Sequence, residues 1–434
     1  MSNQLGVIFS TQFPTLLSPG TLQVFAVPKG EWHWQLPLGS SARALIGDQW
    51  KVCIVDRDNT ASIYRVQLLD ILQRRTDWSI PLSTSLKLFP AAISKDAVII
   101  AEEQQDSMVL YALESKNGSE RWRASLPNAC ICTLMGQWLW PPHILGDMLL
   151  LKIIGEDPTY GSAIVALDLQ NGNERWRLTR NADLSQPHPL TSTILLVSIQ
   201  PFSTTQNSEL LALDRVTGTI VWNQSLDGHY DNISSPAVSS SRFYLGVFSH
   251  TKESGSVMCF DTGTGKSLWK TTIDAATPTT PVLDQHDNLY VGTRIIPSLR
   301  SVTKLDAAYG RIQWRVAQVP PPLPPVPTDH LVYIGAETFT PNDPSLGQCM
   351  ALDAGSGATV WTAYPMTYPK LTNPPRIATG GPGYHFAAAP KLTQDGQRVV
   401  FAQSPHELMA VDATTGAKHW QLHLDEDIRW YELV

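Results

Sequence analysis

The chain repeats a pattern of an apolar segment, a polar turn and a second apolar segment. In Ile164–Trp176, apolar residues run up to Asp168, the turn contains Gly172, and Trp176 follows on the far side. Apolar alternation before the aspartate predicts a half-buried β-strand. The turn predicts a hairpin, because glycine readily adopts the positive φ angle that such turns need. The aspartate can close the turn by accepting hydrogen bonds from backbone N–H groups further on.

This frame, Asp-x-x-x-Gly-x-x-x-Trp, recurs along the whole sequence. Complete copies begin at Asp168, Asp214, Asp261, Asp306, Asp353 and Asp412. Partial copies have Glu114 for the aspartate, Arg74 for the glycine after Asp70, or only the Gly30 and Trp34 half. The nine predicted hairpins use nine of the 14 tryptophans: Trp34, Trp78, Trp122, Trp176, Trp222, Trp269, Trp314, Trp361 and Trp420. We expect these tryptophans to dock on neighbouring repeats, because one hairpin cannot bury its own apolar face.

The spacing of these tryptophans predicts the fold class. They lie 44, 44, 54, 46, 47, 45, 47 and 59 residues apart, and periods of about 40–50 residues with several short strands are typical of propeller blades. We therefore predict an all-β chain with a single β-propeller domain over 1–434. Its blades are antiparallel sheets of four strands, named a to d from the axis outward. The hairpin count gives nine blades, with eight as the alternative if the Trp34 hairpin is an appendage.

The two ends of the chain are predicted to share a blade. Residues 1–40 predict only three strands, which leaves that blade without its innermost strand. Residues 428–434 predict one more strand after the last hairpin. Pairing these segments would close the ring and leave no free sheet edge.

The frame, with alanine two residues before the aspartate, resembles the tryptophan-docking repeat of the quinoprotein (pyrroloquinoline-quinone-type, PQQ-like) β-propeller family. The resemblance covers roughly residues 20–425 and implies the propeller fold. It leaves the function open, because this fold serves both dehydrogenases and proteins without catalysis. For a dehydrogenase of this family, the resemblance implies a cofactor site over the ring axis. That site has adjacent disulphide-bonded cysteines, a stacking tryptophan and a calcium site with a catalytic aspartate.

The chain departs from that cofactor-site pattern. Its nearest counterpart to the cysteine pair is Cys130-Ile131-Cys132, in which the cysteines are not adjacent. Period 2 would put both sulfurs on one side of a strand, where a redox or metal role competes with the simpler reading of two small buried residues. No calcium constellation can be identified. We expect no cofactor, no metal site and no catalytic residues.

Composition narrows the classes of partner and compartment. Charged residues make up 16% of the chain, the net charge is −7, and no run is rich in lysine or arginine. These values argue against nucleic acid and anionic membrane surfaces as partners. No apolar run approaches the roughly 18 residues of a membrane-spanning helix, so we expect no membrane insertion. Five scattered cysteines and the absence of a basic leader predict a cytoplasmic protein, if Met1 is the native start.

Strand order divides each blade into two ends. Antiparallel order places the c–d hairpins and a–b turns on one face, the turn face, and the b–c and d–a loops on the other, the loop face. Two long insertions, residues 127–143 and 364–384, fall on the loop face, where we expect function to lie. The candidate binding residues there are Trp138, Trp140, His143, Tyr364, Tyr368, Arg376, Tyr384 and His385. Exposed aromatics with arginine build interfaces and ligand clefts; the alternative is that these rings cap the core.

Two functions follow from this reading. The leading one is a non-catalytic scaffold that presents its loop face to a protein partner. A small-molecule ligand is the other possible binding partner of that face. The alternative is an enzyme that acts on a small organic substrate in an axial cleft. An enzyme should have a deep pocket with a buried histidine or carboxylate of perturbed pKa. A scaffold should have a shallow face with an apolar patch.

Overall fold

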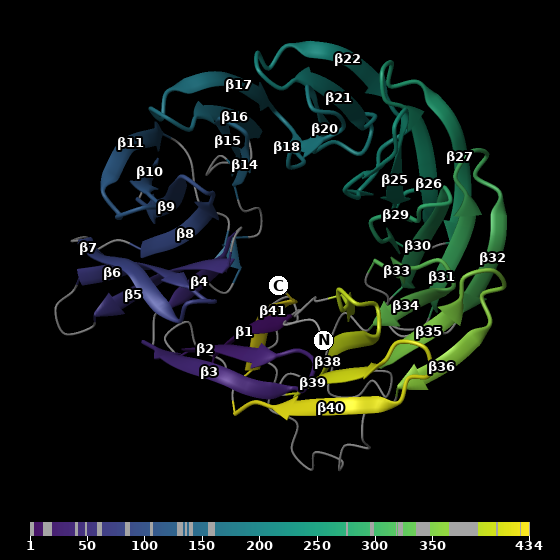
Figure 1. Ribbon diagram of the computed structural model, residues 1–434. Helices are drawn as coiled ribbons and strands as arrows, with labels where there is room; N and C mark the ends of the chain where they lie inside the picture. Colours follow the sequence, from purple (N-terminus) through teal and green to yellow (C-terminus); the bar gives the residue numbers. More distant parts are fainter. Residues whose placement is uncertain are drawn as a thin grey trace, which may run out of the picture. The chain divides into compact units, whose positions relative to one another are not determined.

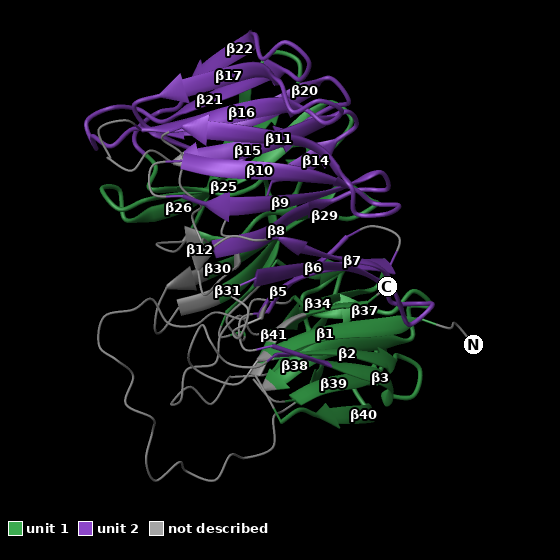
Figure 2. Ribbon diagram, turned by 90° about the vertical axis from the view of Figure 1, so that its left-hand side faces the viewer, with its two compact units in different colours: residues 1–13, 21–36, 230–434 green, residues 14–20, 37–229 purple. Residues whose placement is uncertain are grey.

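The computed structural model resolves the chain into β-strands. It describes residues 4–11, 20–39, 42–47, 50–58, 63–82, 87–104, 107–127, 133–134, 137–138, 142–154, 161–274, 277–295, 299–317, 319, 324–335, 348–363, 389–404, 407–425 and 427–433. Within these residues there is no α-helix. The chain divides into two compact units (Figure 2), unit 1 with residues 1–13, 21–36 and 230–434, and unit 2 with residues 14–20 and 37–229. A single domain over 1–434 stays a prediction.

Unit 2 contains four antiparallel blades whose strands follow chain order. The first two are β4 (Arg43–Ile46), β5 (Lys51–Asp58), β6 (Ile63–Asp70) and β7 (Arg75–Leu82), then β8 (Lys87–Ile93), β9 (Ala97–Glu103), β10 (Ser107–Glu114) and β11 (Glu120–Pro127). The next two are β14 (His143–Leu145), β15 (Met148–Ile154), β16 (Ser162–Asp168) and β17 (Glu174–Arg180), then β18 (Asp183–Leu184), β19 (His188–Pro189), β20 (Ile194–Gln200), β21 (Glu209–Asp214) and β22 (Ile220–Ser225). A separate hairpin of β12 (Thr133–Leu134) and β13 (Gln137–Trp138) lies within the predicted insertion at 127–143.

Unit 1 contains five blades, most of whose strands are labelled in Figure 1. Three are β23 (Asn232–Ile233), β24 (Ala237–Val238), β25 (Arg242–Ser249), β26 (Ser254–Asp261) and β27 (Ser267–Asp274); β28 (Thr277–Pro278), β29 (Val282–Leu283), β30 (Asn288–Ile295), β31 (Leu299–Asp306) and β32 (Ile312–Ala317); and β33 (Val326–Pro327), β34 (Leu331–Gly335), β35 (Cys349–Asp353) and β36 (Thr359–Ala363). The others are β37 (Lys391–Leu392), β38 (Arg398–Ser404), β39 (Glu407–Asp412) and β40 (Lys418–His423), and a last blade of β1 (Leu5–Thr11), β2 (Gly20–Ala26), β3 (Glu31–Leu38) and β41 (Asp427–Leu433).

The first and last strands of the chain share that last blade. Its order is β3-β2-β1-β41, and β1 pairs with β41 from Gly6 opposite Leu433 to Thr11 opposite Asp427 (Figure 1). The Trp34 hairpin therefore belongs to a complete blade and is not an appendage. The predicted fold class is confirmed: the chain forms nine four-stranded antiparallel blades of a β-propeller, and the count is nine, not eight.

The innermost strand is broken into two short pieces in three blades, which explains their five strand labels. In the break between β23 and β24, the Ser234 N–H donates to Gly246 O at 2.8 Å. The Gly246 N–H donates in return to Ser234 Oγ at 2.9 Å, so a side chain takes the place of a backbone carbonyl. The same exchange links Ser185 with Ser198 and Thr279 with Gly292.

The repeated hairpin has a similar local geometry in its six complete copies, as the Asp168 turn illustrates. Gly172 has a φ angle of +73° and donates its N–H to Asp168 O at 2.8 Å. Asp168 Oδ1 accepts the backbone N–H of Gln170 at 2.8 Å and that of Asn171 at 3.1 Å. A bulge follows, and it brings Trp176 directly opposite Ala166 on the neighbouring strand. The small alanine leaves room for the indole ring.

Seven of the hairpins also receive a tryptophan from the preceding blade. Trp122 is buried, and its Nε1–H donates to Leu169 O at 2.8 Å, at the start of the next hairpin. Its ring lies so close to Gly172 that an added Cβ there would come within 2.6 Å of the ring. Equivalent indole-to-carbonyl bonds join Trp78 to Ser115, Trp176 to Arg215, Trp269 to Ala307, Trp314 to Ala354, Trp361 to Ala413 and Trp420 to Val27.

The third strand of a blade is more deeply buried than its sequence pattern predicts. In β16, every residue from Ser162 to Leu167 is buried, so the predicted half-buried strand is wrong. Both faces of the sheet pack on apolar neighbours: Leu167 belongs to a cluster with Leu110, and Ile164 to one with Val197. The fourth strand, β17, does alternate, and Trp176 is one of its buried positions.

Candidate functional site

The predicted binding residues of the loop face fall mostly outside the described residues. This holds for Trp140, Tyr364, Tyr368, Arg376, Tyr384 and His385. Trp138 lies in β13, where its backbone pairs with Thr133; its side chain is not among the described parts of the structure. His143 is described and exposed, as the first residue of β14. The clustering of these residues into one site stays a prediction.

Around His143, the inner strands of two successive blades of unit 2 bring polar side chains together. His143 Nε2 lies 3.4 Å from Gln186 Oε1, in the break between β18 and β19. His188, in β19, is half-buried, and burial with the nearby His143 lowers its pKa to about 4. Because this pKa lies well below 7, the His188 imidazole is neutral at pH 7.

A buried ion pair joins the same two blades. Lys152 in β15 has only 2% of its side chain exposed, and its Nζ donates to Asp183 Oδ1 in β18 at 2.8 Å. Removing the carboxylate of such a pair takes the counter-charge away from a buried ammonium group, which is destabilising. This pair fastens β18 to its neighbouring blade, and its carboxylate remains 43% exposed.

Catalytic chemistry in the described part of the chain could come from metal-ligating groups or from cysteine thiols. Within the described ranges, no three histidine, cysteine or acidic side chains lie together in a way that could hold a metal ion. The thiols of Cys53, Cys259 and Cys349 are buried and free. Burial raises all three pKa values, that of Cys259 to about 12, so these thiols stay protonated and unreactive at neutral pH. Cys130 and Cys132 lie outside the described residues.

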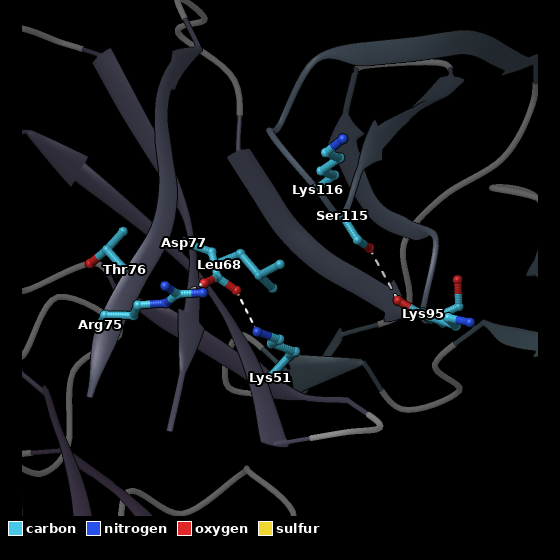
Figure 3. Close-up of a pocket in the computed structure, with 9 residues that line it drawn as sticks. Lys51, Leu68, Arg75, Thr76, Asp77, Lys95, Ser115 and Lys116 are labelled. Atoms are coloured by element: carbon cyan, nitrogen blue, oxygen red, sulfur yellow. Dashed lines mark hydrogen bonds and ion pairs between the residues drawn. The ribbon is translucent and has the colours of Figure 1, made fainter. Parts of the chain in front are cut away.

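The structure also contains a pocket that sequence reasoning missed. It lies on the turn face of unit 2, has a volume of about 380 Å³, and is lined by Lys51, Leu68, Arg75, Thr76, Asp77, Ser94, Lys95, Ser115 and Lys116. Figure 3 shows Lys51, Arg75 and Asp77 on one side, with Ser115, Lys95 and Lys116 on the other. These residues come from five separate segments of the sequence and form no motif, so no sequence signal marked them.

Comparison with known proteins places the blades among PQQ-like repeats. The sequence model of the family described as outer membrane protein assembly factor BamB matches residues 160–247, 234–343 and 345–429. No curated protein matches the chain. In the described part of the chain, no helix has the length and apolar character needed to cross a bilayer.

Several solved structures share the fold at low sequence identity. BamB from Moraxella catarrhalis is 15% identical with a TM-score of 0.50, over 86% of this chain and 94% of that chain. The dihydro-heme d1 dehydrogenase NirN, in complex with DHE, is 12% identical with a TM-score of 0.51, over 99% and 75%. A eukaryotic initiation factor is 8% identical with a TM-score of 0.61, over 100% and 98%. At these identities the likeness concerns the fold alone.

Proposed function

Because this chain belongs to the family described as outer membrane protein assembly factor BamB, we propose that it is a non-catalytic scaffold that binds a protein partner through its loop face. The observation that carries the proposal is the family match across three successive stretches of blades, since the family is named for an assembly factor. BamB from Moraxella catarrhalis, which shares the fold, carries the same name.

The insertion at 127–143 supports the loop face as the binding surface. It follows β11 at the loop end of its blade and adds the β12–β13 hairpin to the four blade strands. Trp138 is one of the residues of this hairpin. Aromatic residues are common anchors of protein interfaces.

The proposal is tested by removing one aromatic residue from each insertion. The double variant Trp140→Ala with Tyr368→Ala should weaken partner binding, because truncated aromatic anchors typically cost about 1–4 kcal/mol of binding energy. The partner is first captured from the native cell with the full-length protein and identified. Its affinity for both proteins is then measured by calorimetry, and their stability by urea unfolding.

Asp261→Ala is the matched control on the turn face. Asp261 Oδ1 accepts hydrogen bonds from the backbone N–H and the hydroxyl of Thr264 at 2.8 and 2.7 Å. Its loss should lower stability by about 1 kcal/mol and leave binding unchanged. If the control abolishes binding while the aromatic pair does not, the loop face is the wrong surface. If the aromatic pair unfolds the protein, those rings belong to the core.

An enzyme is the second candidate, and one observation favours it. His188 combines burial with a pKa lowered to about 4 on an inner strand, which is a common property of functional histidines. A scaffold role predicts that His188→Gln leaves partner binding intact. A cytoplasmic location remains part of the proposal, to be tested by fractionation of the native cell.

A further inference from the structure

The pocket on the turn face of unit 2 concentrates positive charge. Four cations line it, Lys51, Arg75, Lys95 and Lys116, together with the single carboxylate of Asp77. The whole chain has a net charge of −7. The positive field here is therefore a local feature of these two blades, and such local fields attract ligands of opposite charge.

The carboxylate in the pocket is compensated by its neighbours. Lys51 Nζ donates to Asp77 Oδ2 at 2.5 Å, and Arg75 Nε donates to Asp77 Oδ1 at 3.1 Å, so each oxygen has a cationic donor. Lys51 also donates to Asp70 Oδ2 at 2.7 Å. Burial alone would lower the pKa of Lys51, but the hydrogen bonds to Asp70 and Asp77 raise it, so the ammonium stays charged.

Among the described residues, the two remaining lysines of the pocket form no ion pair. Lys95 lies in the turn between β8 and β9, and Lys116 in the hairpin between β10 and β11. Ser115 joins the β10–β11 hairpin to the β8–β9 turn by two hydrogen bonds. Its Oγ donates to Ser94 O at 3.1 Å, and its N–H donates to Asp96 O at 3.2 Å. Within the described part of the chain, neither lysine ammonium has an ion-pair or hydrogen-bond partner.

We propose that this pocket binds a compact anion with at least two negative charges, carried on phosphoryl or carboxylate oxygens. Lysine ammonium groups suit both kinds of oxygen, because they act as strongly hydrated point charges without a fixed planar geometry. A volume of about 380 Å³ falls within the range of about 300–1,000 Å³ that small-ligand sites occupy. The site is separate from the loop face and does not depend on the scaffold proposal.

Titration calorimetry of the full chain with pyrophosphate and, separately, with citrate tests the proposal at constant ionic strength. At least one probe should bind, and its affinity should fall as salt is added, because these charges face solvent. The double variant Lys95→Gln with Lys116→Gln should weaken binding about tenfold, since two exposed cations are lost. The probe that binds more tightly identifies the phosphoryl or the carboxylate group as the preferred source.

Lys266→Gln is the matched control, because Lys266 lies in the equivalent hairpin between β26 and β27 and does not line the pocket. It should leave the affinity unchanged. The site is refuted if neither probe binds at millimolar concentration, or if the control weakens binding as much as the pair does. All three lysines are exposed, so urea unfolding of each variant should match that of the parent protein.

Discussion

At the scale of single residues, the hairpin glycine performs two separate tasks. Its φ angle of about +70° closes the turn, which sequence reasoning anticipates from the turn length alone. Its missing side chain also makes room for a tryptophan of the preceding blade, as Gly172 does for Trp122. Only the structure separates these tasks, because the second one involves a residue 50 positions away in the sequence.

Gly172→Ala and Gly396→Ala form a matched pair that separates the tasks. Both glycines have positive φ angles, of +73° and +69°, but a Cβ at Gly396 meets nothing within 4 Å. Gly396→Ala should cost only the strain of the left-handed backbone, about 1–2 kcal/mol. Gly172→Ala should cost a further ~1–3 kcal/mol, because the Trp122 ring must move. Urea unfolding measures both, and equal losses would show that Trp122 contributes little at this contact.

His188 should make stability depend on pH between about 6.5 and 4. Its pKa is about 4 in the folded protein against 6.5 for a free histidine. The unfolded chain therefore binds a proton at His188 more readily than the folded protein does. The stability of the fold with a neutral His188 is fully present above pH 6.5, and it is lost as the pH falls toward 4. The loss should approach about 3 kcal/mol.

The measurement is the unfolding free energy of parent and His188→Gln proteins across that pH window. The parent curve should fall more steeply than that of the variant. His423→Gln is the control, because 70% of that side chain is exposed. Parallel curves for the parent and His188→Gln would mean that His188 is not buried as a neutral group.

Residue-scale features were predictable where they depend on neighbours in sequence. The aspartate, glycine and tryptophan positions of the hairpin follow from turn chemistry. The alanine two residues before the aspartate was visible in the sequence, but its cause was not. It lies opposite the tryptophan across the bulge, as Ala166 does with Trp176. Arg74 occupies the glycine position with a φ angle of +53°, which shows that this turn tolerates a side chain.

At the scale of elements, the main error of the sequence-based prediction was the burial of the third strand of a blade. The sequence of β16 alternates weakly, so we predicted a strand with one buried face, yet both faces are buried. Burial of a strand depends on what covers each face, and neighbouring blades cover both here. The breaks in the inner strands were also missed. Each break has a serine or threonine two residues before a proline, as in Ser234 and Pro236, and proline cannot donate to the ladder.

Replacement of residues 427–433 by a glycine–serine segment of equal length should destabilise the protein and promote association. The change removes β41 and leaves β1 with an unpaired edge, which is a template for pairing between chains. Light scattering at increasing protein concentration measures association, and urea unfolding measures stability. A monomeric variant of unchanged stability would show that β41 contributes nothing to the blade.

Lys391→Gln is the control for this replacement. It removes the ion pair between Lys391 and Glu432, at 2.6 Å, and keeps the β41 strand intact. This variant should remain monomeric. Association of the control would assign the effect to lost charge and not to the open strand edge.

At the scale of the whole molecule, the fold was largely predictable and the sites were not. Nine tryptophan hairpins could be counted because each one is a local signal, and the shared terminal blade followed from the strand missing at residues 1–40. The turn-face pocket could not be predicted, because Lys51, Arg75, Lys95 and Lys116 meet only through the packing of two blades. The loop-face residues were predicted from strand alternation and from the length of the two insertions, and their assembly into one site is still a prediction.

The pairing of β1 with β41 has a consequence for how the protein is made. Ribosomes synthesise chains from the N-terminus at about 5–20 residues per second, so β1 waits roughly 20–80 seconds for its partner. Throughout that interval the nascent chain carries an open strand edge. Other blades can complete as their strands emerge, whereas this one must be the last to finish. During translation, we therefore expect association between nascent chains to begin at this exposed edge.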